Sequence, residues 1–127
     1  MDSVLIIDDE PTILSVMEEI LCEAGYAVST AASGSAALEK LKREPPPRLI
    51  LVDLYMPQMG GKEFLAALGA IPELRDIPVI LVTGTIPDPS EFPPQGTYAD
   101  SIAKPFDIND LLQRVAALIA GNAAKVS

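Results

Sequence analysis

Five short apolar runs alternate along this chain with longer segments whose apolar residues recur at helical spacing. The runs occupy residues 4–7, 27–31, 49–52, 79–82 and 101–103. Short apolar runs followed by helical patterns are typical of parallel strands joined by helices. The repeated strand and helix pattern therefore predicts an α/β fold with helices packed on a parallel sheet. At 127 residues, the chain fits one domain that buries a core of its own.

The helical segments are bounded by residues that start and stop helices. They are predicted to begin at Pro11, near Ser35, after Gly61 and near Ile108, and the last is predicted to end near Ala120. Proline in the first turn and glycine after the last favour these boundaries. Residues 1–121 are accordingly interpreted as one domain, with residues 122–127 as a flexible tail or the start of a linker.

The segment between Thr83 and Lys104 interrupts this pattern. A helix is expected there, but four prolines occupy the segment, and proline disrupts helix interiors. They are Pro87, Pro89, Pro93 and Pro94. The fourth helix is therefore predicted to be short or disrupted.

Composition restricts the classes of function. A formal charge of −9 disfavours direct nucleic-acid binding by this domain, because phosphate neutralisation needs clustered Lys and Arg. No apolar stretch is long enough to span a bilayer and the start lacks a basic signal-peptide region, so we expect a cytoplasmic protein without membrane contact. The single cysteine, Cys22, falls among apolar residues of the first helix and is interpreted as a small buried residue.

Acidic residues end two of the apolar runs. Asp53 follows residues 49–52, and Asp8, Asp9 and Glu10 follow residues 4–7. If the two strands are parallel neighbours, these acids meet at one edge of the sheet, where two carboxylates about 4 Å apart repel by about 4 kcal/mol. Oxygen ligands alone favour a hard cation such as Mg²⁺, and the absence of histidine disfavours zinc.

A simpler interpretation is that each acid caps the helix that follows it. For Glu10, directly before Pro11, we prefer this interpretation. For Asp8 and Asp53 it explains one acid at a time, but not two acids after two apolar runs.

The last two runs also end in polar residues, Thr83 and Lys104. A hydroxyl and an ammonium beside a carboxylate suit a phosphoryl group arriving on Asp53, because its oxygens need donors and positive charge. Alone, the threonine would be interpreted as a turn residue and the lysine as a solvated charge.

With these four motifs in order, the sequence resembles the receiver domain of two-component response regulators. The residues that carry the resemblance are Asp8-Asp9-Glu10, Asp53 with Met56-Pro57-Gln58-Met59-Gly60-Gly61, Thr83-Gly84 and Lys104-Pro105-Phe106. The resemblance implies a single-domain flavodoxin-like (βα)5 fold, with a five-stranded parallel sheet in the order 2-1-3-4-5 and helices on both faces.

The resemblance also implies a function. Asp53 would accept a phosphoryl group from a sensor histidine kinase or a histidine phosphotransfer protein, and the change would alter binding to a downstream effector or a fused output domain. Mg²⁺ would bind Asp9, Asp53 and the backbone carbonyl of Tyr55, with Asp8 acting through water. Thr83 and Lys104 would hold the phosphoryl oxygens. Such a domain is a signalling module and not an enzyme with a released product.

The sequence departs from the family where an aromatic residue normally precedes the lysine by three positions. Ser101 stands there, and Tyr98 lies three residues earlier. We therefore hypothesise that phosphorylation orders or releases the proline-rich residues 86–95 in place of an aromatic movement.

Two other functions compete with the leading one. A phosphorylation-independent, pseudo-receiver-like interaction module is favoured by the altered switch region alone. A phosphatase or phosphotransferase with an aspartyl nucleophile, like haloacid dehalogenase relatives, would carry an Asp-x-Asp at the first strand, whereas Asp8 and Asp9 are adjacent.

Overall fold

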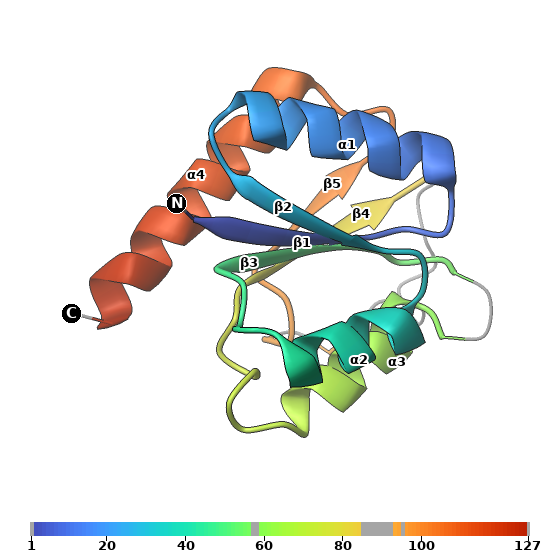
Figure 1. Cartoon of the computed structure of the whole chain (residues 1–127), viewed down its shortest axis with the longest axis vertical. Coiled ribbons are helices and arrows are strands. Elements are labelled where there is room, and N and C mark those ends of the chain that lie inside the picture. Colours follow the sequence, from blue (N-terminus) through green and yellow to red (C-terminus); the bar gives the residue numbers. More distant parts are fainter. Residues whose placement is uncertain (1, 57–58, 85–92, 95, 127) are drawn as a thin grey trace.

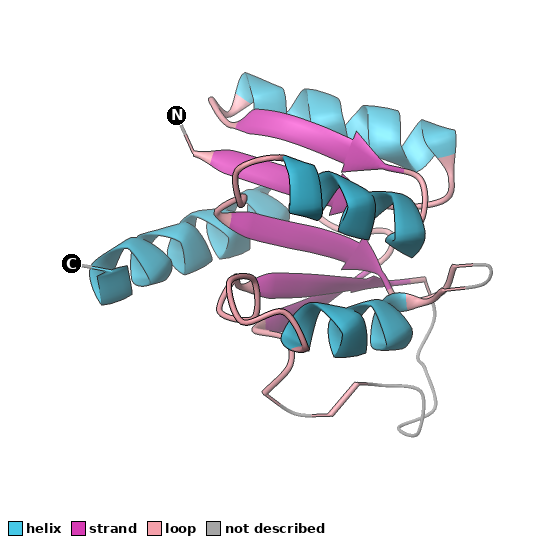
Figure 2. Cartoon of the chain, turned by 60° about the horizontal axis from the view of Figure 1, so that its bottom comes forward, coloured by secondary structure: helices cyan, strands magenta, loops and turns pink. Residues whose placement is uncertain are grey.

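The computed structural model describes residues 2–56, 59–84, 93–94 and 96–126 of the chain. Five strands form one parallel sheet in the order β2-β1-β3-β4-β5. They are β1 (Ser3–Ile7), β2 (Ala27–Ala31), β3 (Leu49–Asp53), β4 (Val79–Thr83) and β5 (Asp100–Ala103). The flavodoxin-like fold and its strand order are confirmed. All five strands point the same way, so their carboxyl ends share one edge of the sheet (Figure 2).

Helices cover both faces of this sheet (Figure 1). The helices of the described residues are α1 (Pro11–Glu23), α2 (Gly34–Arg43), α3 (Gly61–Gly69) and α4 (Ile108–Val126). Helices α1 and α4 pack on one face, and α2 and α3 pack on the other. The Ser33 side chain caps α2 by accepting a hydrogen bond from the Ala36 backbone N–H.

The three central strands divide their side chains between two hydrophobic cores, because successive residues of a strand point to opposite faces. Alternate residues pack towards α2 and α3, namely Leu5, Ile7, Ile50, Val52, Val79 and Leu81. The residues between them pack towards α1 and α4, namely Val4, Ile6, Leu49, Leu51, Ile80 and Val82. This double burial explains why these three strands appear in the sequence as continuous apolar runs.

The prediction that Cys22 is buried is wrong, because its side chain is exposed. On α1 the fully buried residues are Met17 and Leu21, four positions apart and therefore on one side of the helix. Cys22 follows Leu21 by one residue, which turns it about 100° away from the core.

The end of the last helix differs from the sequence-based expectation, and the expected fourth helix is tested only in part. Helix α4 continues past Ala120 to Val126. Between β4 and β5, the described residues 84, 93–94 and 96–99 contain no helix, while residues 85–92 and 95 lie outside the described part. The hypothesis about the proline-rich residues 86–95 therefore stays a prediction. Among the described residues, no helix combines the length and apolar character that crossing a bilayer requires.

Candidate functional site

Strand register brings the first and third strand ends together. Ile7 on β1 is the partner of Val52 on β3, so one further residue along each strand sets Asp8 beside Asp53. Both acids also continue the alternation of the side chains that face α1 and α4. The convergence expected from two acid-terminated apolar runs is therefore present.

Three carboxylates form one cluster at this edge. One oxygen each from Asp8, Asp9 and Asp53 lie within 4.8 Å of one another. Asp8 is 1% exposed and Asp53 is 7% exposed, while Asp9 is more open to solvent. At this separation and burial, mutual repulsion of the charged forms is of the order of several kcal/mol without a positive partner.

Lys104 supplies one positive charge to the cluster. Its Nζ lies 3.0 Å from Asp8 Oδ2 and 3.6 Å from Asp53 Oδ2. The Lys104 backbone N–H also donates to the Thr83 carbonyl at 2.6 Å, which fixes the end of β5 against the end of β4. Three carboxylates and one ammonium leave a formal charge of −3 + 1 = −2.

Backbone amides stabilise the carboxylates from the other side. The Glu10 N–H donates to Asp8 Oδ1 at 3.0 Å, and the Tyr55 N–H donates to Asp53 Oδ1 at 3.3 Å. These contacts close turns next to the strands and do not cap the helices, since the N-cap positions of α1 and α3 are Glu10 and Gly60. Glu10 thus occupies the N-cap position of α1, as interpreted from the sequence, but its side chain makes no capping hydrogen bond.

The remaining predicted residues also lie at this edge. Thr83 is the last residue of β4 and is 5% exposed. It follows Val82, the register partner of Asp53. Tyr55 comes two residues after Asp53 and is 41% exposed.

Ser101 stands where the family normally has an aromatic residue. It pairs with Leu81 inside the sheet, and its carbonyl accepts a hydrogen bond from Arg114 of α4.

The environment raises the pKa of Asp53 above its ordinary 3.8. Burial is the largest cause, because it penalises the charged form. The positive charge of Lys104 opposes the increase, and the charges of Asp8 and Asp9 add to it. For Lys104 burial acts to lower the pKa, but the hydrogen bond to Asp8 and the charges of Asp53 and Asp8 together raise it above 10.5. The site thus keeps Lys104 protonated and makes the Asp53 carboxylate more basic than usual.

These shifts predict how stability depends on pH without divalent metal. Because native Asp53 binds its proton more tightly than unfolded Asp53, ionising it opposes folding as pH rises above 3.8. We expect the free energy of unfolding of Asp53→Asn, relative to the parent, to grow as pH rises from about 4 to about 7. Urea unfolding in a chelator measures this difference. A difference that stays constant or shrinks over this range contradicts the electrostatic account.

The donor atoms of the cluster fit a hard divalent cation. All three side-chain donors are carboxylate oxygens, and the chain has no histidine. Oxygen ligands of this kind suit Mg²⁺, and the formal charge of −2 at the cluster matches the charge of one such ion. The residues present therefore fit the metal that the sequence analysis expects.

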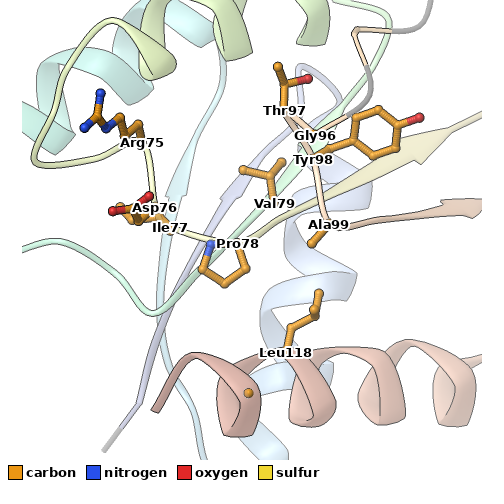
Figure 3. A pocket seen from close by; sticks show the side chains of 11 residues that line it. Arg75, Asp76, Ile77, Pro78, Val79, Gly96, Thr97, Tyr98, Ala99 and Leu118 are labelled. Atoms are coloured by element: carbon orange, nitrogen blue, oxygen red, sulfur yellow. The ribbon is translucent and has the colours of Figure 1, made fainter. Parts of the chain in front are cut away.

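A separate cavity lies at the opposite edge of the sheet. Its volume is about 300 Å³, and it opens between the start of β4, the residues before β5 and helix α4. Pro78, Val79, Ala99 and Leu118 line it (Figure 3). The residues that line this cavity do not include the three acids of the cluster, Thr83 or Lys104, so the cavity plays no part in the candidate site.

Sequence reasoning missed two features near the site. It did not predict that Lys104 pairs more closely with Asp8 than with Asp53, and its expectation that Asp8 acts on the metal through water stays a prediction. It also gave no role to Gly34, beside which the Met59 side chain lies. The spacing of residues carries no signal for either contact, because both join segments distant in the chain.

Comparisons with known proteins identify the wider group to which these features belong. A family model described as the response regulator receiver domain matches residues 4–116. The transcriptional regulatory protein KdpE of Mycobacterium tuberculosis is 34% identical over 125 residues, which cover 98% of this chain and 54% of that protein. The DNA-binding dual master transcriptional regulator RpaA of Synechocystis is 36% identical over 121 residues, covering 94% of this chain and 49% of that protein. The chain thus spans about half the length of these curated relatives.

Solved structures extend the similarity to three dimensions. Chemotaxis protein CheY4 of Vibrio cholerae matches with a TM-score of 0.85 at 28% identity, covering 93% of this chain and 98% of that one. The signal receiver domain of a signal transduction histidine kinase from Syntrophus aciditrophicus matches with a TM-score of 0.84 at 32% identity, covering 95% and 92%. Both likenesses include nearly all of each chain, so they cover the sheet edge that carries the acids.

Proposed function

The chain belongs to the receiver-domain family of response regulators, and on this premise we propose that Asp53 accepts a phosphoryl group in a two-component or phosphorelay system. The donor is a phosphohistidine of a sensor histidine kinase or a histidine phosphotransfer protein, since the chain has no histidine of its own. The observation that carries this proposal is the position of Asp53, within 4.8 Å of two further carboxylates and 3.6 Å from Lys104 Nζ.

In the transfer step, an Asp53 carboxylate oxygen attacks the phosphorus atom. A P–O bond forms as the bond between phosphorus and the donor imidazole nitrogen breaks, and the electron pair of that bond stays with the imidazole. The attacking oxygen must be ionised, and the raised pKa of Asp53 makes the ionised carboxylate a stronger nucleophile. The product is an aspartyl phosphate, a mixed anhydride that hydrolyses readily.

Charge neutralisation at the cluster is the main contribution to catalysis. Bound Mg²⁺ would offset the negative charge of the attacking and transferred oxygens and hold them in line. The carboxylates of Asp9 and Asp53 and the backbone carbonyl of Tyr55 would bind the metal, with Asp8 acting through water. The formal charge of −2 and the all-oxygen donor set support this assignment.

Lys104 and Thr83 would bind the phosphoryl oxygens once the group is on Asp53. The Lys104 ammonium already lies between Asp8 and Asp53, so it reaches the added negative charge with a small shift of its side chain. The Thr83 residue is held at the same edge through its carbonyl, which accepts the Lys104 N–H. Charge-assisted hydrogen bonds of this kind favour the phosphorylated state.

The consequence of phosphorylation is a change in partner binding, as expected of a cytoplasmic signalling module. The two curated relatives described above are about twice the length of the matched region, and both are named as transcriptional regulators. We therefore propose that the receiver controls an effector protein or an output domain. Recognition of DNA would belong to that partner, because the chain carries a formal charge of −9.

The intact mass of the protein tests this function. After incubation with acetyl phosphate or phosphoramidate, we expect a gain of one phosphoryl group with Mg²⁺ present and no gain in a chelator. The chelator sample restored with excess Mg²⁺ is the control for damage to the protein. No gain with either donor and Mg²⁺ would contradict the proposal and favour the phosphorylation-independent interaction module.

A further inference from the structure

Met59, which lies between β3 and α3 in the sequence, is in close contact with the first residue of α2. A Cβ atom built on Gly34 would lie 2.7 Å from the Sδ of Met59 and 2.9 Å from its Cγ. Cβ atoms do not approach other heavy atoms so closely, so Met59 occupies space that only glycine leaves open. Gly34 is buried, and Met59 is partly buried against the core beneath α2 and α3.

Residue 34 is a glycine because a side chain there would collide with Met59, and not because its backbone conformation requires glycine. Gly34 lies outside the left-handed region, in contrast to Gly25, whose φ is 100°. It is the first helical residue after the Ser33 cap, a place where alanine is normally favoured over glycine. The absence of a side chain is therefore explained by the Met59 contact.

Gly61, two residues after Met59, packs on the backbone at the end of β3. The Gly61 N–H donates to the Leu54 carbonyl at 2.9 Å. A Cβ on Gly61 would lie 3.0 Å from Leu54 Cα and 3.1 Å from the Asp53 carbonyl oxygen. The residues that leave the strand and those that enter α3 are thus packed against each other.

Tyr55 directly follows Leu54, so the hydrogen bond from Gly61 to the Leu54 carbonyl connects Tyr55 to the segment that begins with Met59. The N–H of Tyr55 donates to Asp53 Oδ1, and its backbone carbonyl is the third ligand in the proposed metal site. A displacement of residues 59–61 would shift Leu54, and with it the Tyr55 carbonyl, relative to the Asp53 carboxylate. Metal affinity is sensitive to such a change, because Mg²⁺ demands near-ideal ligand geometry.

We propose that Gly34 and Met59 are positioning residues for the metal site: the Met59 side chain, seated against Gly34, fixes residues 59–61, and the Gly61 N–H in turn holds Leu54, the residue before Tyr55. This inference rests on the proposed function, since it assigns the contact to the same site. A methyl group at residue 34 expels Met59 from its place and loosens the hold of residues 59–61 on Leu54.

Titration calorimetry of the unphosphorylated protein with Mg²⁺ tests this inference. We expect Gly34→Ala to raise the Mg²⁺ dissociation constant about tenfold, because losing a residue that orients a metal ligand typically costs about 10–100-fold in affinity. Thermal unfolding without Mg²⁺ should change little by comparison. Gly69→Ala is the matched control, since a Cβ there meets nothing within 4 Å, and its dissociation constant should equal that of the parent.

The Met59→Ala background separates this steric effect from any general effect of alanine on α2. Met59→Ala alone should also weaken Mg²⁺ binding, and adding Gly34→Ala to it should change the dissociation constant less than about twofold, because nothing is left to displace. An equal penalty in both backgrounds would overturn the inference. If Gly34→Ala does not fold, Met59→Ala alone tests the inference. An unchanged Mg²⁺ dissociation constant in that variant would then reject the positioning role of the contact.

The same experiment distinguishes the two levels of the proposal. A parent protein that binds Mg²⁺ while Gly34→Ala and Met59→Ala bind it equally well contradicts only the positioning role. A parent protein that binds no Mg²⁺ contradicts both the positioning role and the proposed function.

Discussion

Asp53→Asn is expected to take up no phosphoryl group from acetyl phosphate in Mg²⁺ and, in a chelator at neutral pH, to resist urea better than the parent. An amide cannot act as the nucleophile, so the loss of uptake should be complete within the sensitivity of intact-mass measurement. The gain in stability follows from the pKa of Asp53, which burial and the neighbouring acids raise. The neutral amide of the variant removes a charge that the folded state disfavours.

Asp76→Asn is the matched control for this variant. Asp76 is exposed and lies at the edge of the sheet opposite to the acidic cluster. The substitution makes the same change in net charge, but phosphoryl uptake should equal that of the parent, and stability should show no comparable gain. Phosphorylation of Asp53→Asn at the parental rate would place the acceptor elsewhere.

Lys104→Met is expected to damage both the fold and the reaction. It leaves the Asp8 and Asp53 side chains, 2% and 9% exposed, without their positive partner. Removing one member of a buried ion pair typically costs about 3–5 kcal/mol, so urea unfolding in a chelator should show a loss of this size. Phosphorylation by acetyl phosphate should slow about 100-fold or more, the effect of removing one donor from a developing anion.

Added metal distinguishes the charge effect of Lys104 from a packing effect. If unpaired carboxylates destabilise Lys104→Met, Mg²⁺ should restore more stability to this variant than to the parent. Lys42→Met, at an exposed position on α2, is the control and should change neither property much. Unchanged stability of Lys104→Met in a chelator would show that Asp8 and Asp53 do not need the ammonium.

The sheet and the convergence of the acids were predictable because the signals are local and strong. Each central strand is buried on both faces, so β1, β3 and β4 appear as apolar runs that end at a polar residue. A parallel sheet then brings those ends to one edge, which places Asp8 and Asp53 together. The strand order itself came from the family resemblance, since alternation of strands and helices is compatible with several orders.

The features that sequence did not predict depend on contacts between distant segments or on helix rotation. Cys22 has apolar neighbours in sequence but lies about 100° around α1 from the buried Leu21. Lys104 pairs more closely with Asp8 than with Asp53, although Asp8 and Lys104 are 96 residues apart in the sequence. Side-chain geometry decides this pairing, and local sequence carries no signal for it. The contact between Gly34 and Met59 likewise has no counterpart in local pattern.

Chemical trapping of the phosphoryl group tests the central claim most directly. Borohydride reduces an aspartyl phosphate to homoserine, whereas phosphate esters of Ser, Thr and Tyr do not react in this way. After phosphorylation in Mg²⁺, reduction and proteolysis, peptide mass spectrometry should find homoserine at residue 53 and at no other aspartate. Trapping at another residue, or a phosphoryl group that resists reduction, would contradict the assignment of Asp53 as the acceptor.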